Sequence, residues 1–257
     1  RIWIRYRLWR IISPFFHVRE PKVWVFMGGC YNSGTTILRE MIGAHPDVAS
    51  LPREGVEMTD AFPNLESDGW IRMWYRNANK SELSDRDPVV LARQAKRDWA
   101  PWWRRDAHAF IEKSIVHGAW MPALDAGFPN ARFIGVIRNG YCVCEGIRRR
   151  AKPNGAARDI LGSDDYPIDE VGRQWVFANE VLMRDHSHVK NYMAIHYEDF
   201  TANPIETIRG LFDFIGVSPD AVTRDIDGVI VIGTRRFEIR NQNPQSFARL
   251  NEQDRVS

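Results

Sequence analysis

The chain has 257 residues, of which 44% are hydrophobic and 26% charged, and this composition excludes a disordered, collagen-like or small disulfide-stabilised protein. The 35 Lys and Arg residues nearly balance the 33 Asp and Glu residues, so bulk charge does not indicate a nucleic-acid partner. The three cysteines, Cys30, Cys142 and Cys144, favour a reducing compartment, and their spacing predicts no metal site. No apolar run reaches the roughly 18 residues that span a bilayer, so we expect a cytoplasmic protein.

The first segment, residues 1–20, is a basic arm. Four arginines alternate with bulky apolar residues between positions 1 and 10. Two interpretations stay open: the arm packs on the rest of the chain, or it makes a peripheral contact with a membrane surface.

Short apolar runs and helical hydrophobic spacing alternate along the rest of the chain. In chain order they predict a strand at 22–27, a helix at 35–44, a strand at 109–114, a short helix at 121–126, a strand at 132–137, a helix at 140–150, a helix at 166–190, a strand at 191–197 and a helix from 204 to 216.

Buried strands that alternate with helices predict an α/β fold, with a three-layer arrangement and a mainly parallel sheet covered by helices on both faces. We expect residues 1–257 to form a single domain, with polar, loop-rich insertions at 49–88 and 151–167. In such sheets ligands bind beyond the carboxyl ends of the strands, so the loops that follow the predicted strands should converge on one crevice.

A glycine-rich loop, residues 28–36, joins the first predicted strand to the first helix. Its glycines allow backbone N–H groups to surround a phosphate at the positive end of the helix, although a simple tight turn is the alternative. From Gly29 to Gly34 the spacing matches the nucleoside-triphosphatase loop G-x-x-x-x-G-K-[ST], but Thr35 stands at the lysine position. The missing lysine weakens the interpretation as a nucleotide or small-molecule kinase.

The same loop, read as G-x-x-x-S-G-T-T, resembles the phosphosulfate loop of sulfotransferases that use 3′-phosphoadenosine 5′-phosphosulfate (PAPS). Further elements in family order carry the resemblance: Ala44-His45-Pro46-Asp47, the segment 132–140 with its arginine, Tyr197-Glu198-Asp199-Phe200, and Glu112-Lys113-Ser114 with His117. The resemblance implies a P-loop-like sulfotransferase fold and the transfer of a sulfo group from PAPS to an acceptor hydroxyl. The product would be 3′,5′-bisphosphoadenosine (PAP), and no metal is needed. The acceptor is expected to be a carbohydrate, a lipid or a small metabolite.

The resemblance also implies residues that hold the nucleotide. Arg138 corresponds to the family arginine at the 3′-phosphate, and Gly146 stands where a serine is usual, so that one hydroxyl donor is missing. Arg150 could replace it, Tyr197 resembles a tyrosine near the adenine, and Arg249 corresponds to a C-terminal basic loop. The 5′-phosphosulfate would be held by the loop residues Asn32, Ser33, Gly34, Thr35 and Thr36.

The catalytic residues are less directly implied. Asn32 occupies the position of a lysine or arginine that in most of the family reaches the bridging oxygen, and a neutral donor binds more weakly than a charged one. Lys113 is our candidate for the missing cation. Deprotonation of the acceptor hydroxyl needs a carboxylate or histidine, for which Glu54 is the first candidate and Glu57 and His117 are the alternatives.

Two questions stay open at this stage. Asn32 and Gly146 are also compatible with an inactive nucleotide- or membrane-binding module. Several aromatic residues lie in or after the first insertion, and they either face a flat acceptor such as a sugar or fill the core: Trp70, Trp74, Tyr75, Trp99, Trp102 and Trp103. The sequence gives no oligomeric state.

Overall fold

The computed structural model describes residues 20–256 apart from 82, 84, 85, 103 and 105. The strands are β1 (Val23–Gly29), β2 (Val48–Ser50), β3 (Ala109–Lys113), β4 (Ala131–Ile137), β5 (Tyr192–His196), β6 (Val222–Arg224), β7 (Ile230–Ile232) and β8 (Arg235–Phe237). The helices are α2 (Thr35–Ile42), α3 (Pro88–Trp99), α4 (Met121–Gly127), α5 (Gly140–Arg150), α6 (Gly155–Leu161), α7 (Ile168–Asp185), α8 (Tyr197–Ala202), α9 (Pro204–Ile215), α10 (Asn243–Phe247) and α11 (Glu252–Val256).

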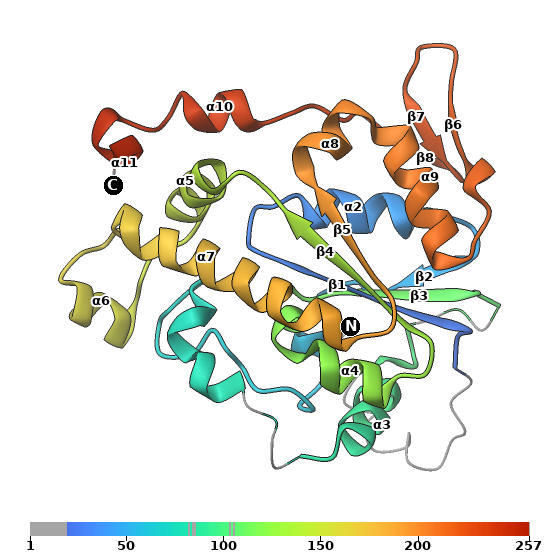
Figure 1. Ribbon diagram of the computed structural model, residues 1–257, viewed down its shortest axis with the longest axis horizontal. Helices are drawn as coiled ribbons and strands as arrows, with labels where there is room; N and C mark the ends of the chain where they lie inside the picture. The colour runs from blue at the N-terminus through green and yellow to red at the C-terminus, as the bar shows by residue number, and fades with distance from the viewer. Residues whose placement is uncertain (1–19, 82, 84–85, 103, 105, 257) are drawn as a thin grey trace.

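The central sheet has five strands in the order β2-β3-β1-β4-β5, and all its pairings are parallel. β1 lies in the middle, where Trp24 is opposite Phe110 of β3 and Ala131 of β4. The sheet crosses the middle of the molecule with helices on both sides (Figure 1). The predicted α/β fold with a mainly parallel sheet is therefore confirmed.

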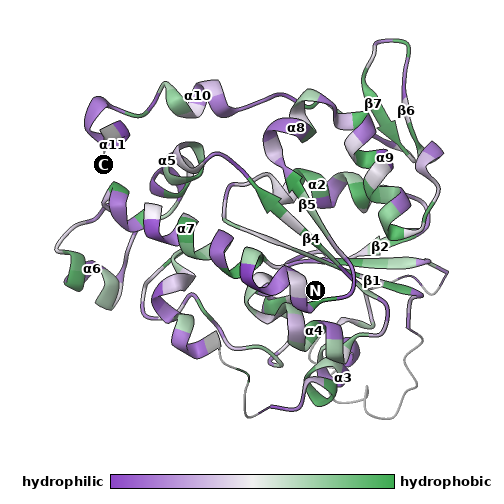
Figure 2. Ribbon diagram, in the orientation of Figure 1, coloured by the Kyte–Doolittle hydropathy of each residue, from purple (hydrophilic) through white to green (hydrophobic). Residues whose placement is uncertain are grey.

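Successive residues of β1 enter two different hydrophobic clusters, because side chains of a strand alternate between its faces. Trp24 and Phe26 pack with residues of α3, α4, α5 and α7, whereas Val25 and Met27 pack with residues of α2 and α9. The hydropathy colours show the same arrangement, with hydrophobic strands between helices that are hydrophobic on part of their surface (Figure 2). Full burial of one such side chain stabilises the fold by roughly 1.5–3 kcal/mol, so both helical layers hold the sheet.

The predicted elements are all present, with shifts at their ends, and the insertions contain elements that the sequence reading left out. The helix predicted at 166–190 spans only Ile168–Asp185, and Tyr197 begins α8 instead of ending a strand. The first insertion begins within β2 and reaches the start of α3, which Asp87 caps by accepting a hydrogen bond from the Val89 N–H with Pro88 in the first turn. The second insertion contains α6.

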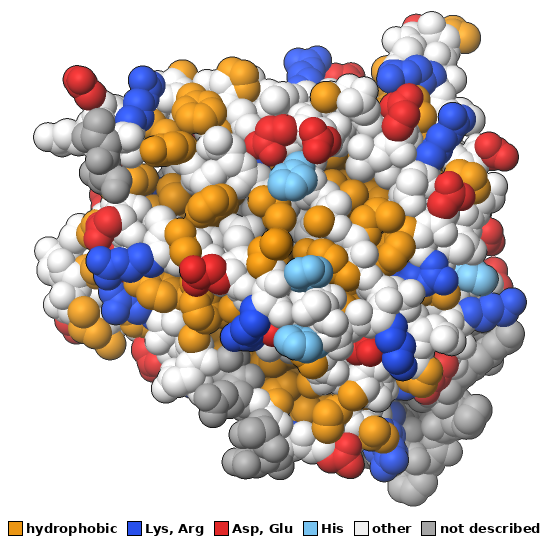
Figure 3. Space-filling model, viewed as in Figure 1, with side chains coloured by type: hydrophobic (Ala, Val, Ile, Leu, Met, Phe, Trp, Pro, Cys, Tyr) orange, Lys and Arg blue, Asp and Glu red, His pale blue; other side chains and the backbone are white. Residues whose placement is uncertain are grey.

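The face of Figure 3 shows hydrophobic side chains across its middle, with charged side chains distributed around them. On α7, Val176 and Met183 are about half exposed. Among the described residues no helix is both long enough and apolar enough to cross a membrane. Residues 1–19 of the predicted basic arm lie outside the described residues.

Candidate active site

A cleft of about 1090 Å³ lies beyond the carboxyl ends of β1, β3 and β4. Its lining comes from the glycine-rich loop, the ends of β3 and β4, helix α5, the first insertion, and the segment before α10. The predicted site residues that line it are Asn32, Gly34, Thr35, Thr36, Glu54, Lys113, Arg138, Arg150 and Tyr197. The topology thus brings together residues that are more than 100 positions apart in the sequence, as expected for the carboxyl edge of a parallel sheet.

The loop owes its shape to two residues in left-handed backbone conformations. Asn32 has φ 61° and Gly34, at the N-terminus of α2, has φ 94°. A Cβ atom on Gly34 would lie 2.6 Å from the Tyr197 ring, so only glycine allows this ring to pack on the loop. Tyr197 is held there because its hydroxyl donates to the Arg240 carbonyl (3.3 Å) and accepts from the Gln242 N–H (3.1 Å).

Arg138, directly after β4, is buried under the loop. Its Nη1 donates to the Asn32 carbonyl (2.7 Å) and its Nε to Asn243 Oδ1 (2.8 Å), and its guanidinium lies 4.2 Å from the centre of the Tyr197 ring. Asn243 in turn donates to Glu198 (2.6 Å). The sequence reading missed Asn243, because its role depends on the return of the C-terminal segment to the cleft.

Three polar groups around the loop are buried without a hydrogen-bond partner in the part of the chain that the structure describes. They are Arg138 Nη2, Asn32 Nδ2 and Ser33 Oγ. Each can donate a hydrogen bond, and leaving such groups unsatisfied costs about 1–3 kcal/mol each, more for a charged one. Their chemistry fits an anion with several acceptor oxygens, such as a phosphate ester.

Asn32 lies where the loop, α5 and the first insertion meet. Its Oδ1 accepts hydrogen bonds from Arg150 Nη1 (3.0 Å) and from Arg72 Nη1 (3.2 Å). Arg72, which also lines the cleft, was not recognised in the sequence because the insertion has no periodic pattern to place it. On α5, a Cβ atom at Gly146 would lie 3.0 Å from the Asn32 Cβ, so the two residues are in close contact, although Gly146 does not line the cleft.

Arg249 is not where the sequence reading expected it. It does not line the cleft; its Nη1 lies 3.6 Å from the carboxylate of Glu145 on α5, and its side chain is about half exposed. The C-terminal segment reaches the cleft earlier, through Gln242, and the neighbouring Asn243 contacts Arg138. This arrangement does not favour Arg249 as a residue of the nucleotide pocket, and that role stays a prediction.

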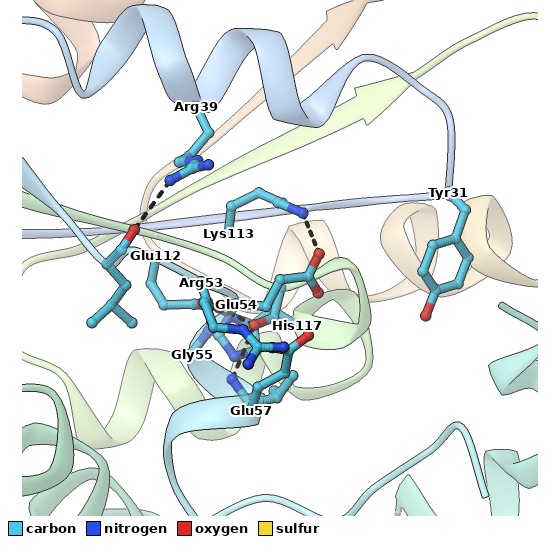
Figure 4. Close-up of polar contacts among 12 residues, drawn as sticks. Tyr31, Arg39, Arg53, Glu54, Gly55, Glu57, Glu112, Lys113 and His117 are labelled. Atoms are coloured by element: carbon cyan, nitrogen blue, oxygen red, sulfur yellow. Dashed lines mark hydrogen bonds and ion pairs between the residues drawn. The ribbon is translucent and has the colours of Figure 1, made fainter. Parts of the chain in front are cut away.

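Glu54 and Lys113 form an ion pair in the cleft. In Figure 4 the Lys113 ammonium, from the end of β3, and the Glu54 carboxylate point toward one another, with Tyr31 of the loop to one side. Burial raises the pKa of Glu54, and the charge and hydrogen bond of Lys113 oppose this rise without cancelling it. A carboxylate with a raised pKa is a stronger base than an ordinary one.

The backbone next to Glu54 is fixed by the buried carboxylate of Glu112. Glu112 accepts hydrogen bonds from the Gly55 N–H and from Ser114 Oγ (2.6 Å), and a Cβ atom at Gly55 would lie 2.6 Å from its Cγ. Burial pushes the pKa of Glu112 upward, but His117, Ser114 and the Gly55 N–H outweigh burial and leave that pKa below its ordinary value. Glu112 thus holds the turn that carries Glu54.

His117 is a core residue. It is 1% exposed, and its Nδ1 lies 2.5 Å from Glu112 Oε2. Its ring packs against Phe26, Phe62 and Trp120 at centroid distances of 5.3–6.1 Å. His117 does not line the cleft, which does not favour it as the alternative base, and that role stays a prediction.

The remaining wall of the cleft comes from residues 54–66. This segment carries four carboxylates and no Lys or Arg, and the cleft is lined by all four: Glu54, Glu57, Asp60 and Glu66. The aromatic residues that the sequence suggested for either the acceptor site or the core lie away from the cleft wherever the structure describes them. Three of them are buried in the core, namely Trp70, Trp74 and Trp99. Tyr75 and Trp102 are partly buried against it, and Trp103 lies outside the described residues. None of the five that the structure describes lines the cleft.

Metal binding receives no positive support. Across the described ranges no three His, Cys, Asp or Glu side chains are grouped so that they could hold a metal ion. Cys30, Cys142 and Cys144 are buried free thiols.

The parallel sheet, the glycine-rich loop before a helix, and the arginine after β4 define an α/β protein with a phosphate-binding type of loop. Comparison with known proteins names the family. A profile described as the sulfotransferase family matches residues 25–221, and the chain belongs to this family.

Individual relatives agree with this assignment. The chain is 24% identical over 200 residues to a putative protein-tyrosine sulfotransferase of Caenorhabditis briggsae, covering 74% of this chain and 64% of that one. It is 25% identical over 218 residues to protein-tyrosine sulfotransferase 1 of Danio rerio, covering 80% and 56%. The chain therefore spans less than two thirds of the length of these relatives.

A solved structure supports the fold alone. The sulfotransferase STF1 of Mycobacterium tuberculosis superimposes with a TM-score of 0.54 at 16% identity, covering 84% of this chain and 71% of that one. The P-loop-like sulfotransferase fold expected from the sequence is thus confirmed.

Proposed function

We propose that this protein transfers the sulfo group of PAPS to the hydroxyl of an acceptor molecule. Family membership supports sulfotransfer, and the buried Arg138 is the observation that supports the nucleotide donor. Its guanidinium bridges the loop and the C-terminal segment, and its Nη2 lacks a partner within the described residues. A buried cation with a free donor beside a phosphate-type loop fits a phosphorylated nucleotide.

The donor, when bound, supplies a sulfuryl group whose bond to the bridging phosphate oxygen breaks as the acceptor oxygen bonds to sulfur. The backbone of the loop at Gly34, with the Thr35 and Thr36 hydroxyls, would orient the phosphosulfate. Glu54 would accept the proton of the acceptor hydroxyl. Lys113 favours the ionised form of Glu54 and lines the cleft, where it would counter negative charge that develops on the leaving oxygen.

The acceptor is an unknown hydroxyl compound, and the lining of the cleft limits its charge. The wall formed by residues 54–66 combines carboxylates with Val56, Phe62 and Leu65. Lys113 and Arg53 pair with Glu54 and Glu57, but the wall still has more carboxylates than these two cations balance. A polyanionic acceptor would be disfavoured, so we propose a neutral or cationic carbohydrate, lipid or small metabolite. The names of the relatives favour a second candidate, a tyrosine hydroxyl on a protein.

The donor is tested by calorimetry with PAP, adenosine 5′-monophosphate and ATP. We expect PAP to bind most tightly and ATP to bind weakly whether or not Mg²⁺ is present. Tight, Mg²⁺-dependent ATP binding would instead support the kinase alternative. In Arg138→Ala, PAP binding should weaken about 10²-fold or more, as expected when a buried charged hydrogen-bond donor is lost, whereas adenosine 5′-monophosphate binding should change little.

Catalysis is tested by following transfer of radiolabelled sulfate from PAPS to panels of neutral, cationic and anionic hydroxyl compounds and tyrosine peptides. Glu54→Gln should preserve PAP binding and lower turnover by about 10²-fold or more. Failure of every panel, with PAP binding intact, would favour the inactive-module alternative. Location in the cytoplasm and membrane contact through residues 1–20 stay predictions.

A further inference from the structure

The basic side chains that line the cleft differ in whether a carboxylate pairs with them. They are Arg72, Lys113, Arg138 and Arg150, and within the described residues only Lys113 forms a salt bridge with a carboxylate. The three arginines meet at a single loop residue: Arg138 donates to the Asn32 carbonyl, and Arg72 and Arg150 donate to its side-chain oxygen.

Arg72 and Arg150 are close enough to repel one another. Their Nη1 atoms share one oxygen at 3.2 and 3.0 Å, so they lie no more than 6.2 Å apart. Burial and the neighbouring charges of Arg149 and Arg72 lower the pKa of Arg150. Guanidinium groups gathered in this way are suited to a multiply charged anion, since Arg forms bidentate hydrogen bonds with phosphate oxygens.

The direction of the Asn32 side chain indicates which end of the nucleotide this anion belongs to. The side chain lies against Gly146 of α5, where a Cβ atom would be 3.0 Å from its Cγ and 3.2 Å from its Nδ2. At position 146 the family resemblance places a serine whose hydroxyl donates to the 3′-phosphate. The phosphosulfate end of the loop, at Gly34, lies instead against Tyr197.

The two departures from the family pattern are therefore in contact. Glycine at position 146 leaves room for the Asn32 amide, and the Asn32 Nδ2 is a buried donor without a partner in the described part of the chain. The amide of Asn32 thus presents a donor next to the position from which the usual serine would donate.

We propose that Arg72, supplied by the first insertion, binds the 3′-phosphate of the nucleotide together with Arg150, and that Asn32 orients both arginines and replaces the missing hydroxyl at position 146. This inference rests on the proposed PAPS donor. It adds Arg72, a residue outside the motifs of the family, and it makes the insertion part of the nucleotide site.

The first experiment compares PAP with adenosine 5′-monophosphate, which lacks the 3′-phosphate, by calorimetry on the full chain. Arg72→Ala should weaken PAP binding about 10- to 100-fold, the usual effect of losing a charged hydrogen bond, and adenosine 5′-monophosphate binding less than about twofold. Arg72→Lys should retain part of the affinity, because the charge remains. Arg158→Ala is the matched control, since Arg158 pairs with Asp164 and does not line the cleft.

The outcomes distinguish a failure of the proposed PAPS donor from a failure of the role proposed for Arg72. If the wild-type protein binds PAP no better than adenosine 5′-monophosphate, the proposed donor fails. If it prefers PAP, but Arg72→Ala changes neither affinity or weakens both equally, the donor stands and the role of Arg72 is refuted.

A second experiment tests Asn32 and Gly146 without changing any arginine. Gly146→Ser should weaken PAP binding, because its Cβ crowds the Asn32 side chain. Adding Asn32→Gly should restore part of the binding, since glycine tolerates φ 61° and the serine hydroxyl regains its space, although the two arginines lose the amide oxygen that orients them. We expect the double variant to bind PAP more tightly than either single variant. Additive losses in this cycle would refute the coupling.

Discussion

The ion pair of Glu54 and Lys113 predicts how the pH dependence of turnover changes when Lys113 is lost. Burial raises the pKa of Glu54 and Lys113 lowers it, so in Lys113→Met the pKa of Glu54 should rise further. An opposite charge in contact lowers a carboxyl pKa by about 1–3 units. The Glu54 side chain is 28% exposed, so solvent screens part of the Lys113 charge, and the rise lies toward the lower end of this range.

The assay is the pH profile of kcat/KM for sulfo transfer, which reports the free enzyme. Glu54 acts as a base only when ionised, so activity falls as the pH drops through its pKa. Lys113→Met should therefore move this acid limb to higher pH. Carbon-13 NMR of the Glu54 carboxyl should show the same displacement without any acceptor.

The control for this prediction is Lys80→Met. Lys80 pairs with Asp68, is 41% exposed and does not line the cleft, so the acid limb should stay in place. An unmoved limb in Lys113→Met, or one moved to lower pH, would refute the assignment of Glu54 as the base whose charge Lys113 stabilises.

Three further predictions concern the turn, the loop and the acceptor wall. Glu112→Gln should lower the free energy of unfolding by about 3 kcal/mol in urea titrations, because a neutral amide replaces the buried carboxylate that accepts hydrogen bonds from the Gly55 N–H and Ser114 Oγ. The folded pKa of Glu112 lies below its unfolded value of about 4.3, so this contribution exists above that pH and is lost as the pH falls through the folded pKa; a loss that grows toward acid pH would contradict a fold that favours the ionised carboxylate. Gly34→Ala should weaken PAP and adenosine 5′-monophosphate binding alike, since its Cβ would collide with Tyr197; unchanged binding by calorimetry would contradict the loop geometry. Glu57→Lys should raise kcat/KM for anionic acceptors about 2- to 5-fold at low salt and less at high salt, and a salt-independent result would argue against an electrostatic wall.

The sequence predicts the fold well where local pattern and burial coincide. The apolar run at 22–27 becomes the central strand β1, and a strand buried on both faces must be apolar throughout. The sequence pattern does not predict α3 or α6, because polar helices on the surface lack a wide apolar face; α6 lies within the second insertion, whereas α3 begins at the last residue of the first. The cap formed by Asp87 and Pro88 was the available signal for α3.

Residues of the site could be predicted only where a sequence motif places them just after a strand of the sheet. Arg138 follows a strand and Glu54 follows the turn after β2, and both line the cleft. His117 lies in the core because four residues after the end of β3 the chain has turned back inward. Arg72 reaches the cleft, and Asn243 reaches Arg138, only through tertiary packing, for which the sequence has no periodic signal.

Asn32 shows why residues judged one at a time can mislead. Taken alone, Asn32 lacks the positive charge of the usual lysine or arginine, and Gly146 lacks the hydroxyl donor of the usual serine. The backbone at position 32 is left-handed, a conformation that Asn adopts more readily than Lys or Arg, and glycine at position 146 accommodates the amide. Under our proposal, positive charge then comes from Arg72 and Arg150, which approach the loop from outside it. Changing one residue of this contact without the others should therefore cost more affinity than changing the set together.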